Sequence, residues 1–318
     1  LEAIQAYLTE IHRYPDAETV QLREVIAEKR GFAPDQVLVT NGGDELITLL
    51  SETHLEPGDE VIVLSPYWVS LWSFVGVFVI VGIGLDLLLG YTGQLSLGQT
   101  TFMGISAYTI ALTVQHFGVS AWAAVAIALA TTLILATILG LVVLRLSGYY
   151  FTLATLAIAI ATEALAKGMP GTLGGPTGLR VRSELSLPGF ALDSPTRLFS
   201  ATWIVVALAL VVALRLTRAR TGRAMQAVGA DEDVARATAI DPFSTKVKAF
   251  VISAGFAAVA GALYAHILMF VSPHSLGLVG GLDSIVGLLL GGFGTVWGAL
   301  IGVPVVRLAP QLIERFAT

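Results

Sequence analysis

The sequence contains no cysteine and few charged residues. The absence of cysteine excludes disulfide bonds, thiolate catalysis and cysteine metal sites, although it leaves the compartment undecided. Only 13% of the 318 residues are charged and 55% are hydrophobic, whereas soluble domains carry roughly 25% charged residues. The composition therefore predicts a membrane protein.

The charged residues are unevenly distributed along the chain. Residues 1–69 carry thirteen acidic and four basic side chains, whereas residues 70–318 carry ten acidic and fourteen basic ones. Histidines and acids are not paired at the spacing of metal ligands, so we expect no metal site. The sequence also gives no reason to expect a nucleic-acid partner. The two parts of the chain are thus unlike and are interpreted separately.

The first part has a short α/β pattern. An amphipathic helical period in "DAETVQLREVIAEKRGF" is followed by a buried strand at 37–40, a glycine turn, a helix from about Asp44 and a second buried strand at 61–64. The turn "TNGGDE" can offer backbone N–H groups at a helix N-terminus to a phosphate. It can equally be a tight turn that needs a flexible backbone, and the pattern alone leaves both interpretations open.

"RYPDAETVQLREVIAEKRGFAPDQVLVTNGGDELITLL" together with "PGDEVIVLSPYWVS" resembles the N-terminal part of a pyridoxal-phosphate aminotransferase of the histidinol-phosphate type. The resemblance implies that Gly43 and Asp44 correspond to residues that hold the cofactor phosphate. It implies that Trp68 corresponds to the aromatic residue that stacks on the pyridine ring. Tyr14 would correspond to a tyrosine that reaches a phosphate in the partner subunit.

The rest of such an enzyme is missing, because the resemblance ends at about residue 70. No position matches the lysine that forms the Schiff base with the cofactor. After residue 70 the lysines are Lys167, Lys246 and Lys248, all in membrane-protein context. We therefore expect no transaminase activity and no cofactor in this chain, with pyridoxal phosphate implied only by the resemblance of an incomplete fragment.

Three long uncharged runs dominate the second part. They cover residues 87–144, 249–282 and 284–306, and a helix needs about 20 apolar residues to span a membrane. The fold class we predict is mainly α, a polytopic transmembrane helical bundle of about seven or eight spans, with a short incomplete α/β segment before it. The predicted helices are 71–90, 98–116, 120–144, 149–167, 199–215, 249–271 and 283–308, the last broken at "GGFGT".

The basic residues between the predicted helices indicate the orientation. Seven lysines and arginines lie in 215–248, and short basic loops stay in the cytoplasm. Counting back, the helix 71–90 runs from outside to inside. This count requires that 98–116 crosses the membrane fully, since a re-entrant segment there would reverse everything before it.

The stretch "GYTGQLSLGQTTFMG", residues 90–104, interrupts an apolar run with polar and small residues. Irregular backbone at membrane depth is tolerated only where protein or a water-filled cavity covers it. The stretch can therefore line a translocation path, or it can be an ordinary interfacial turn followed by a packing face. The candidates for the path are Gly93, Gln94, Ser96, Gly98 and Gln99.

The stretch "GRAMQAVGADEDVARATAIDPFSTKVKAF", residues 222–250, forms the predicted cytoplasmic loop. We expect a break at Gly229 and a short helix opened by Asp231, Glu232 and Asp233, because acids favour a helix N-terminus. Its surface would expose small residues from Val234 to Thr238. The loop is either a solvated connector or a docking helix for a cytoplasmic partner.

These stretches, with "LRLSGYYFTLATLA" and "GGPTGL", resemble the permease of branched-chain amino-acid ABC transporters over about 71–318. The resemblance implies a multi-pass subunit of the bacterial inner (cytoplasmic) membrane, with no catalysis of its own. Its implied partners are membrane lipid, a paired permease subunit, two cytoplasmic ATPase subunits that bind ATP, and a periplasmic substrate-binding protein. It also implies that the first and last family helices are missing. The family's coupling loop corresponds to 222–241, with Arg223, Asp231, Glu232, Asp233, Ala235 and Ala239 as the residues expected to contact the ATPase.

The sequence departs from this family at three positions. Gln99 stands where His is common, Asp86 where Asn is common and Ala239 where Gly is usual. An ionisable Asp86 is expected to face protein or water, since it would be costly in lipid.

The two resemblances meet between Ser70 and Leu71 with no linker between them. We interpret the chain as a chimera of an aminotransferase-like fragment, 1–70, and a permease domain, 71–318. The predicted function is that of the permease subunit of an amino-acid importer. The alternatives are an aminotransferase fragment and a chimera that performs neither function, and the sequence does not identify the solute.

Overall fold

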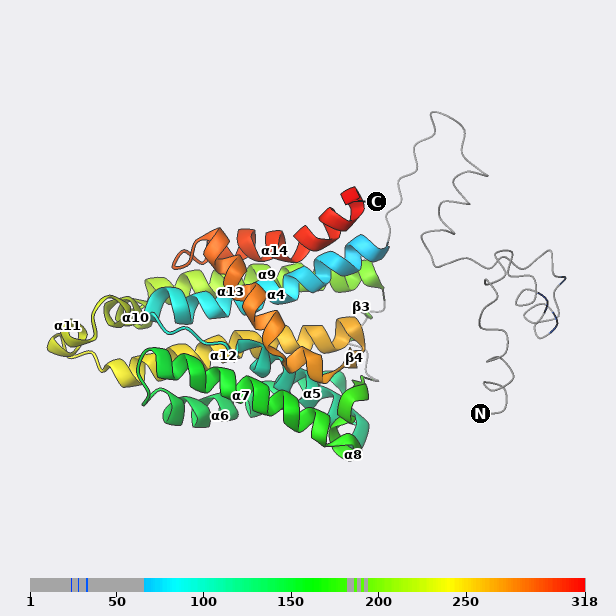
Figure 1. Ribbon diagram of the computed structural model, residues 1–318, viewed down its shortest axis with the longest axis horizontal. Coiled ribbons are helices and arrows are strands. Elements are labelled where there is room, and N and C mark those ends of the chain that lie inside the picture. The colour runs from blue at the N-terminus through cyan, green and yellow to red at the C-terminus, as the bar shows by residue number, and fades with distance from the viewer. Residues whose placement is uncertain are drawn as a thin grey trace, which may run out of the picture. The chain divides into compact units, whose positions relative to one another are not determined.

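The computed structural model describes residues 66–181, 186–187, 190–191 and 194–317, with the isolated residues Glu24, Glu28 and Ala33. The strands and helices expected in 1–65 lie outside the described residues. The chain divides into two units, Leu1–Val63 and Leu64–Thr318, and the second unit contains the helices of Figure 1.

The described part of this unit is a bundle of long helices with small hairpins and turns between them (Figure 1). The longer helices are α4 (Pro66–Thr92), α5 (Gln99–Phe117), α6 (Ala121–Val143), α7 (Tyr149–Gly168), α9 (Pro195–Arg218), α10 (Arg220–Ala230), α12 (Pro242–Leu268), α13 (Leu278–Gly291) and α14 (Trp297–Ala317). The shorter elements are α8 (Pro170–Leu173), η2 (Gly175–Thr177), β1 (Leu179–Arg180), β2 (Ser186–Leu187), β3 (Phe190–Ala191), α11 (Glu232–Ala237), β4 (Phe270–Val271) and η3 (Pro273–Leu276). β1 pairs antiparallel with β4, and β2 with β3.

The predicted helices are confirmed, including the break at "GGFGT", which separates α13 from α14. Several helices begin earlier than expected, because capping residues rather than hydropathy fix their starts. α12 begins at Pro242, where the carboxylate of Asp241 accepts hydrogen bonds from the backbone N–H groups of Phe243 and Ser244. α9 begins at Pro195, after Ser194 caps it in the same way.

Five described helices are long and apolar enough to cross a membrane, namely α4 from Trp68 onward, α6, α7, α9 and α12. α4 forms the centre of the bundle, since 83% of its most apolar window is buried, whereas the corresponding share is 22% in α6 and in α9. Apolar side chains on α6 and α9 therefore face outward, as lipid-exposed helices do. With 14 residues, α13 is about 21 Å long, too short to span a hydrocarbon core of about 30 Å alone.

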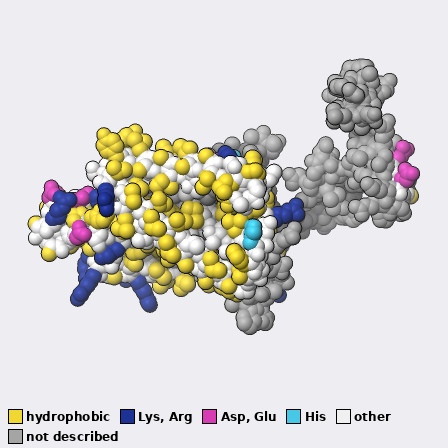
Figure 2. All heavy atoms as spheres, turned by 90° about the horizontal axis from the view of Figure 1, so that it is seen from below, with side chains coloured by type: hydrophobic (Ala, Val, Ile, Leu, Met, Phe, Trp, Pro, Cys, Tyr) yellow, Lys and Arg dark blue, Asp and Glu magenta, His cyan; other side chains and the backbone are white. Residues whose placement is uncertain are grey.

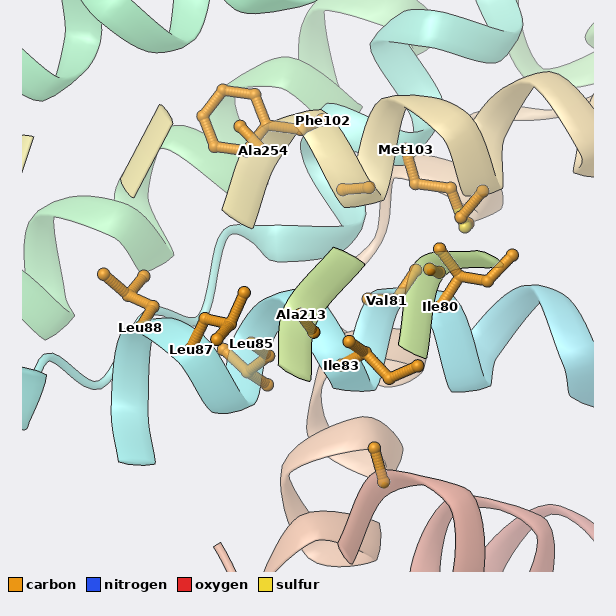
Figure 3. Packing of buried hydrophobic residues seen from close by; sticks show 14 of the residues in the cluster. Ile80, Val81, Ile83, Leu85, Leu87, Leu88, Phe102, Met103, Ala213 and Ala254 are labelled. Carbon is orange, nitrogen blue, oxygen red and sulfur yellow. The ribbon is translucent and has the colours of Figure 1, made fainter. Parts of the chain in front are cut away.

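The core is built on α4, which packs against α5, α9, α12 and α14. Figure 3 shows aliphatic side chains of α4 from Ile80 to Leu88 near Phe102 and Met103 of α5 and Ala254 of α12. Phe102 and Phe151 both pack edge-on against Phe250, an arrangement that the ring quadrupoles favour.

Candidate functional site

The stretch between α4 and α5 is non-helical, and its polar side chains are buried. α4 ends at Thr92, Gly93 adopts a φ of +69°, and α5 begins only at Gln99. The side chains of Gln94, Ser96 and Gln99 are 8%, 1% and 1% exposed. We call residues 93–98 the unwound segment.

The unwound segment leads deep into the bundle. Nε2 of Gln99 donates a hydrogen bond to Oγ of Ser253 at 2.6 Å, and Ser253 Oγ donates to the carbonyl of Gly84 at 2.6 Å. At a rise of 1.5 Å per residue, Gly84 lies about 12 Å before the end of α4 and Ser253 about 16 Å after the start of α12. The first residue of α5 is therefore far from both of those helix ends. The start of α5 therefore lies inside the bundle, whereas Gly93, next to the end of α4, is exposed.

Helix α7 satisfies backbone groups of the unwound segment. The N–H of Leu97 donates to Oγ1 of Thr155 at 3.1 Å, and the hydroxyl of Thr152 donates to the carbonyl of Leu95 at 2.9 Å. Protein therefore covers this irregular backbone, as its depth requires. Within the described residues, Oε1 of Gln99 and Oγ1 of Thr101 are buried without a hydrogen-bond partner, which leaves polar capacity for a further group.

We expect replacement of Thr155 by Val to lower the free energy of unfolding by roughly 1–3 kcal/mol, because it leaves the Leu97 N–H buried without an acceptor. The measurement is denaturant unfolding of the purified protein in mixed micelles. The matched control is Thr137→Val, since the exposed Thr137 hydroxyl bonds only to the carbonyl of Leu133 on its own helix. Equal stability of the two variants would contradict this role of Thr155.

Asp86 is completely buried on α4. Its Oδ1 accepts the N–H of Gly294 at 2.6 Å and its Oδ2 accepts the N–H of Val296 at 2.9 Å. The expectation that this carboxylate faces protein is confirmed. It holds the turn between α13 and α14 against α4, a role that its position in the sequence did not reveal.

The predicted cytoplasmic loop forms two helices, α10 and α11, at one end of the bundle (Figure 1). The short helix opened by the acids is confirmed, since Oδ1 of Asp231 accepts the N–H groups of Asp233 and Val234 and caps α11. Glu232 forms an ion pair with Lys246, the fifth residue of α12, whose side chain is 7% exposed. This pair joins the loop to a helix of the core.

Two details of the loop differ from expectation. Gly229 is not a break, because α10 continues to Ala230 and the chain becomes extended at Asp231. A Cβ at Gly229 would lie 2.5 Å from the carbonyl of Tyr91, so this glycine permits close packing on the end of α4. Of the small residues expected on the surface, Val234 is 62% exposed whereas Ala235 is 1% exposed.

The remaining candidate residues of the loop are accessible. Arg223 is exposed, and its Nη1 donates to the carbonyl of Arg218 at 2.9 Å. Ala239 has a φ of +61°, a conformation that suits glycine better. Figure 2 shows basic and acidic side chains gathered at this end of the bundle, beside a largely hydrophobic surface.

Of the residues expected to match a pyridoxal-phosphate site, the structure describes only Trp68. Tyr14, Gly43 and Asp44 lie outside the described residues, and Trp68 lies in the first turn of α4. The correspondence of these residues to a pyridoxal-phosphate site therefore stays a prediction.

Comparison with known proteins gives two separate matches. The family of the branched-chain amino acid transport system / permease component matches residues 67–318. The family of class I and II aminotransferases matches residues 2–75. The two matches overlap at 67–75, around the junction expected between Ser70 and Leu71.

Individual relatives also match either the permease part of the chain or its N-terminal part. The chain is 29% identical over 271 residues to the high-affinity branched-chain amino acid transport system permease protein LivM of Salmonella typhimurium, and equally to that of Escherichia coli. The alignments cover 78% of this chain and 64% of those permeases, so the chain spans less than two thirds of their length. Histidinol-phosphate aminotransferase of Rhodospirillum centenum is 45% identical over 62 residues, which cover 20% of this chain and 17% of that enzyme. No solved structure matches the chain.

Proposed function

We propose that this chain, which belongs to the family of branched-chain amino acid transport system permease components, forms the membrane-spanning path of an amino-acid importer. The observation that carries the proposal is the unwound segment, which leads from the end of α4 into the interior of a helical bundle whose outer helices turn apolar side chains outward. Interrupted helices inside a bundle are typical of transport paths. We assign Gly93, Gln94, Ser96, Gly98 and Gln99 to the path, in a multi-pass protein of the bacterial inner membrane.

A buried polar atom without a hydrogen-bond partner in the described structure supports this assignment. Gln99 is buried, yet its Oε1 has no partner in the described structure. A buried acceptor without a partner costs roughly 1–3 kcal/mol. Such a cost is explained if the atom binds water or a passing solute during the transport cycle.

The α10–α11 loop is the proposed contact with the ATPases. α10 packs on the end of α4 through Gly229, and α11 joins α12 through the Glu232–Lys246 ion pair. A movement of the loop would therefore reach α4, which leads into the unwound segment, and α12, whose Ser253 accepts a hydrogen bond from Gln99. ATP would be bound by the partner subunits, and a paired permease and a periplasmic binding protein complete the proposed assembly.

We expect Asp233→Lys combined with Val234→Asp to abolish co-purification with the ATPase subunit of a branched-chain amino acid importer. These side chains are 89% and 62% exposed, so the change alters a surface and spares the Asp231 cap. The measurement is retention of the ATPase on the immobilised full chain. Thr196→Lys, exposed near the start of α9, is the control and should retain the ATPase. Failure of the unaltered chain to retain it would refute the proposed assembly.

No observation in the described residues favours transamination. The aminotransferase relatives are matched over less than a fifth of their length, 17% for the enzyme of Rhodospirillum centenum. Lys167 and Lys246 are both held in ion pairs, with Glu163 and Glu232. We therefore propose a transport subunit joined to a fragment of an enzyme.

A further inference from the structure

We propose that Arg307 receives the carboxylate of the transported solute in exchange for its internal partner, Asp283. This inference rests on the proposed transport function and names the group that would recognise the solute. Neither residue was singled out from the sequence, because their proximity depends on the packing of α13 against α14.

The two residues form an ion pair within apolar helices. Nη1 of Arg307 lies 3.2 Å from Oδ2 of Asp283, and the two side chains are 16% and 36% exposed. Ionisable residues within membrane spans are costly and mark solute or ion paths. The partial exposure of Asp283 gives a solute access to the pair.

The guanidinium group is fixed by further contacts. Its Nη2 donates to the carbonyl of Gly280 at 3.2 Å, and its central carbon lies 3.6 Å from the ring centroid of Phe78. Nε is buried without a partner in the described structure. Phe78 therefore supports one face of a planar group that retains an unused N–H, and such a group can bind a carboxylate with two parallel hydrogen bonds.

Two helix N-termini meet beside this arginine. α13 begins after Gly277 and α5 after Gly98, both without a side-chain cap. The hydroxyl of Thr100 donates to the carbonyl of Gly277 at 2.9 Å, and a Cβ at Gly281 would lie 3.2 Å from that hydroxyl oxygen. Because helix N-termini carry partial positive charge, the surroundings of Arg307 favour an anion.

The two acidic residues near Arg307 differ in how closely each is bound to its basic partner. Glu163 approaches Gly277, but it is held by Lys167 at 2.7 Å. Asp283 holds Arg307 by a contact that is longer than a typical charge-assisted hydrogen bond of about 2.7–2.9 Å. A solute carboxylate can therefore displace Asp283 toward the exposed side while the net charge at Arg307 stays unchanged.

The position of Arg307 fits the path. A Cβ at Gly280 would lie 3.4 Å from both Nη2 of Arg307 and Cγ2 of Thr100, and Thr100 follows Gln99 directly. Gly280 of α13 thus separates the arginine from the start of α5, where the unwound segment ends.

The test uses the full chain in lipid nanodiscs and saturation-transfer NMR with three probes. L-leucine has both charged groups, 4-methylpentanoate lacks the ammonium group, and L-leucinamide lacks the carboxylate. We expect the first two to bind and the amide to bind at least tenfold more weakly. Arg307→Met should weaken L-leucine binding about tenfold, whereas Asp283→Asn should tighten it about tenfold, because it removes the competing carboxylate. Arg145→Met, at the cytoplasmic end of α6, is the control and should change nothing.

The outcomes separate this inference from the alternatives. Equal binding of L-leucinamide, absence of binding by all probes, or no effect of Arg307→Met would overturn it. If Asp283→Asn weakens binding as much as Arg307→Met, the pair only holds the helices together and the exchange is refuted. The double variant Arg307→Met, Asp283→Leu replaces the ion pair by an apolar contact. It should be as thermally stable as the unaltered chain yet fail to bind L-leucine.

Uptake by the assembled importer distinguishes the two proposals. If the unaltered chain with its ATPase takes up no L-leucine, the proposed function fails. If the unaltered chain takes up L-leucine and Arg307→Met does so equally well, only the role of Arg307 fails.

Discussion

Replacing Gly302 by alanine is expected to separate α14 from α13 and to lower the free energy of unfolding by about 3 kcal/mol. A Cβ at Gly302 would lie 1.8 Å from the carbonyl oxygen of Gly287. This oxygen belongs to the backbone and cannot turn away as a side chain would. The two helices would have to move apart along their contact.

The effect should be large because both helices present glycines at four-residue spacing. Gly287 and Gly291 on α13 face Gly298 and Gly302 on α14, and a Cβ at Gly291 would lie 2.0 Å from the carbonyl oxygen of Gly298. Helices in lipid gain little from the hydrophobic effect when they associate, so close packing of small residues contributes much of their affinity. One methyl group in this contact therefore removes several neighbouring contacts together.

Unfolding by sodium dodecyl sulfate, followed by circular dichroism, measures this loss. Gly255→Ala is the matched control, since a Cβ there meets only the end of the Leu133 side chain at 3.4 Å. It lies within a spanning helix and should change stability by no more than about 0.5 kcal/mol. Equal stability of the two variants would refute the close contact between α13 and α14.

Replacing Asp86 by alanine is expected to lower the free energy of unfolding by roughly 2–5 kcal/mol, because one buried and one partly buried N–H group lose their acceptor together. Gly294 and Val296 donate these bonds, and Val296 is held at a φ of +60°. A non-glycine residue in that conformation needs support from its surroundings. The turn between α13 and α14 should therefore lose its fixed position against α4.

The Asp86→Asn variant tests whether both carboxylate oxygens are needed. It keeps one carbonyl oxygen but turns an amide N–H₂ toward the second donor, so about half of the loss is expected. The same detergent titration measures all variants, with Asp233→Ala as the control, since that side chain is 89% exposed and exposed ion pairs contribute little. An alanine variant as stable as the unaltered chain would show that these two bonds do not hold the turn.

The helices could be predicted from the sequence because their signals are local. Uncharged runs indicated the helices, although five described helices, rather than the seven or eight predicted, are long and apolar enough to span a membrane. The polar residues between Gly93 and Gln99 indicated an interruption between two helices. The acids at 231–233 indicated α11 through capping, which acts within a single turn. The early start of α12 was missed, since Asp241 and Pro242 begin the helix before its apolar run.

The contacts of the site could not be predicted, because they join residues that are distant in the sequence. Asp86 meets Gly294 across 208 positions, and Gln99 meets Ser253 across 154. The glycine of α10 was misread as a break for the same reason. Gly229 is required by the approach of Tyr91, which lies far from it along the chain.

The junction between the two resemblances falls inside a continuous helix. Residues 67–75 belong to both family matches, yet they lie in the first turns of α4. Proline at a first helical position and tryptophan near a membrane surface suit such a turn whatever their ancestry. The boundary between the two family matches and the boundaries of the helices therefore differ in this chain, since residues that match the aminotransferase family open a helix of the permease bundle.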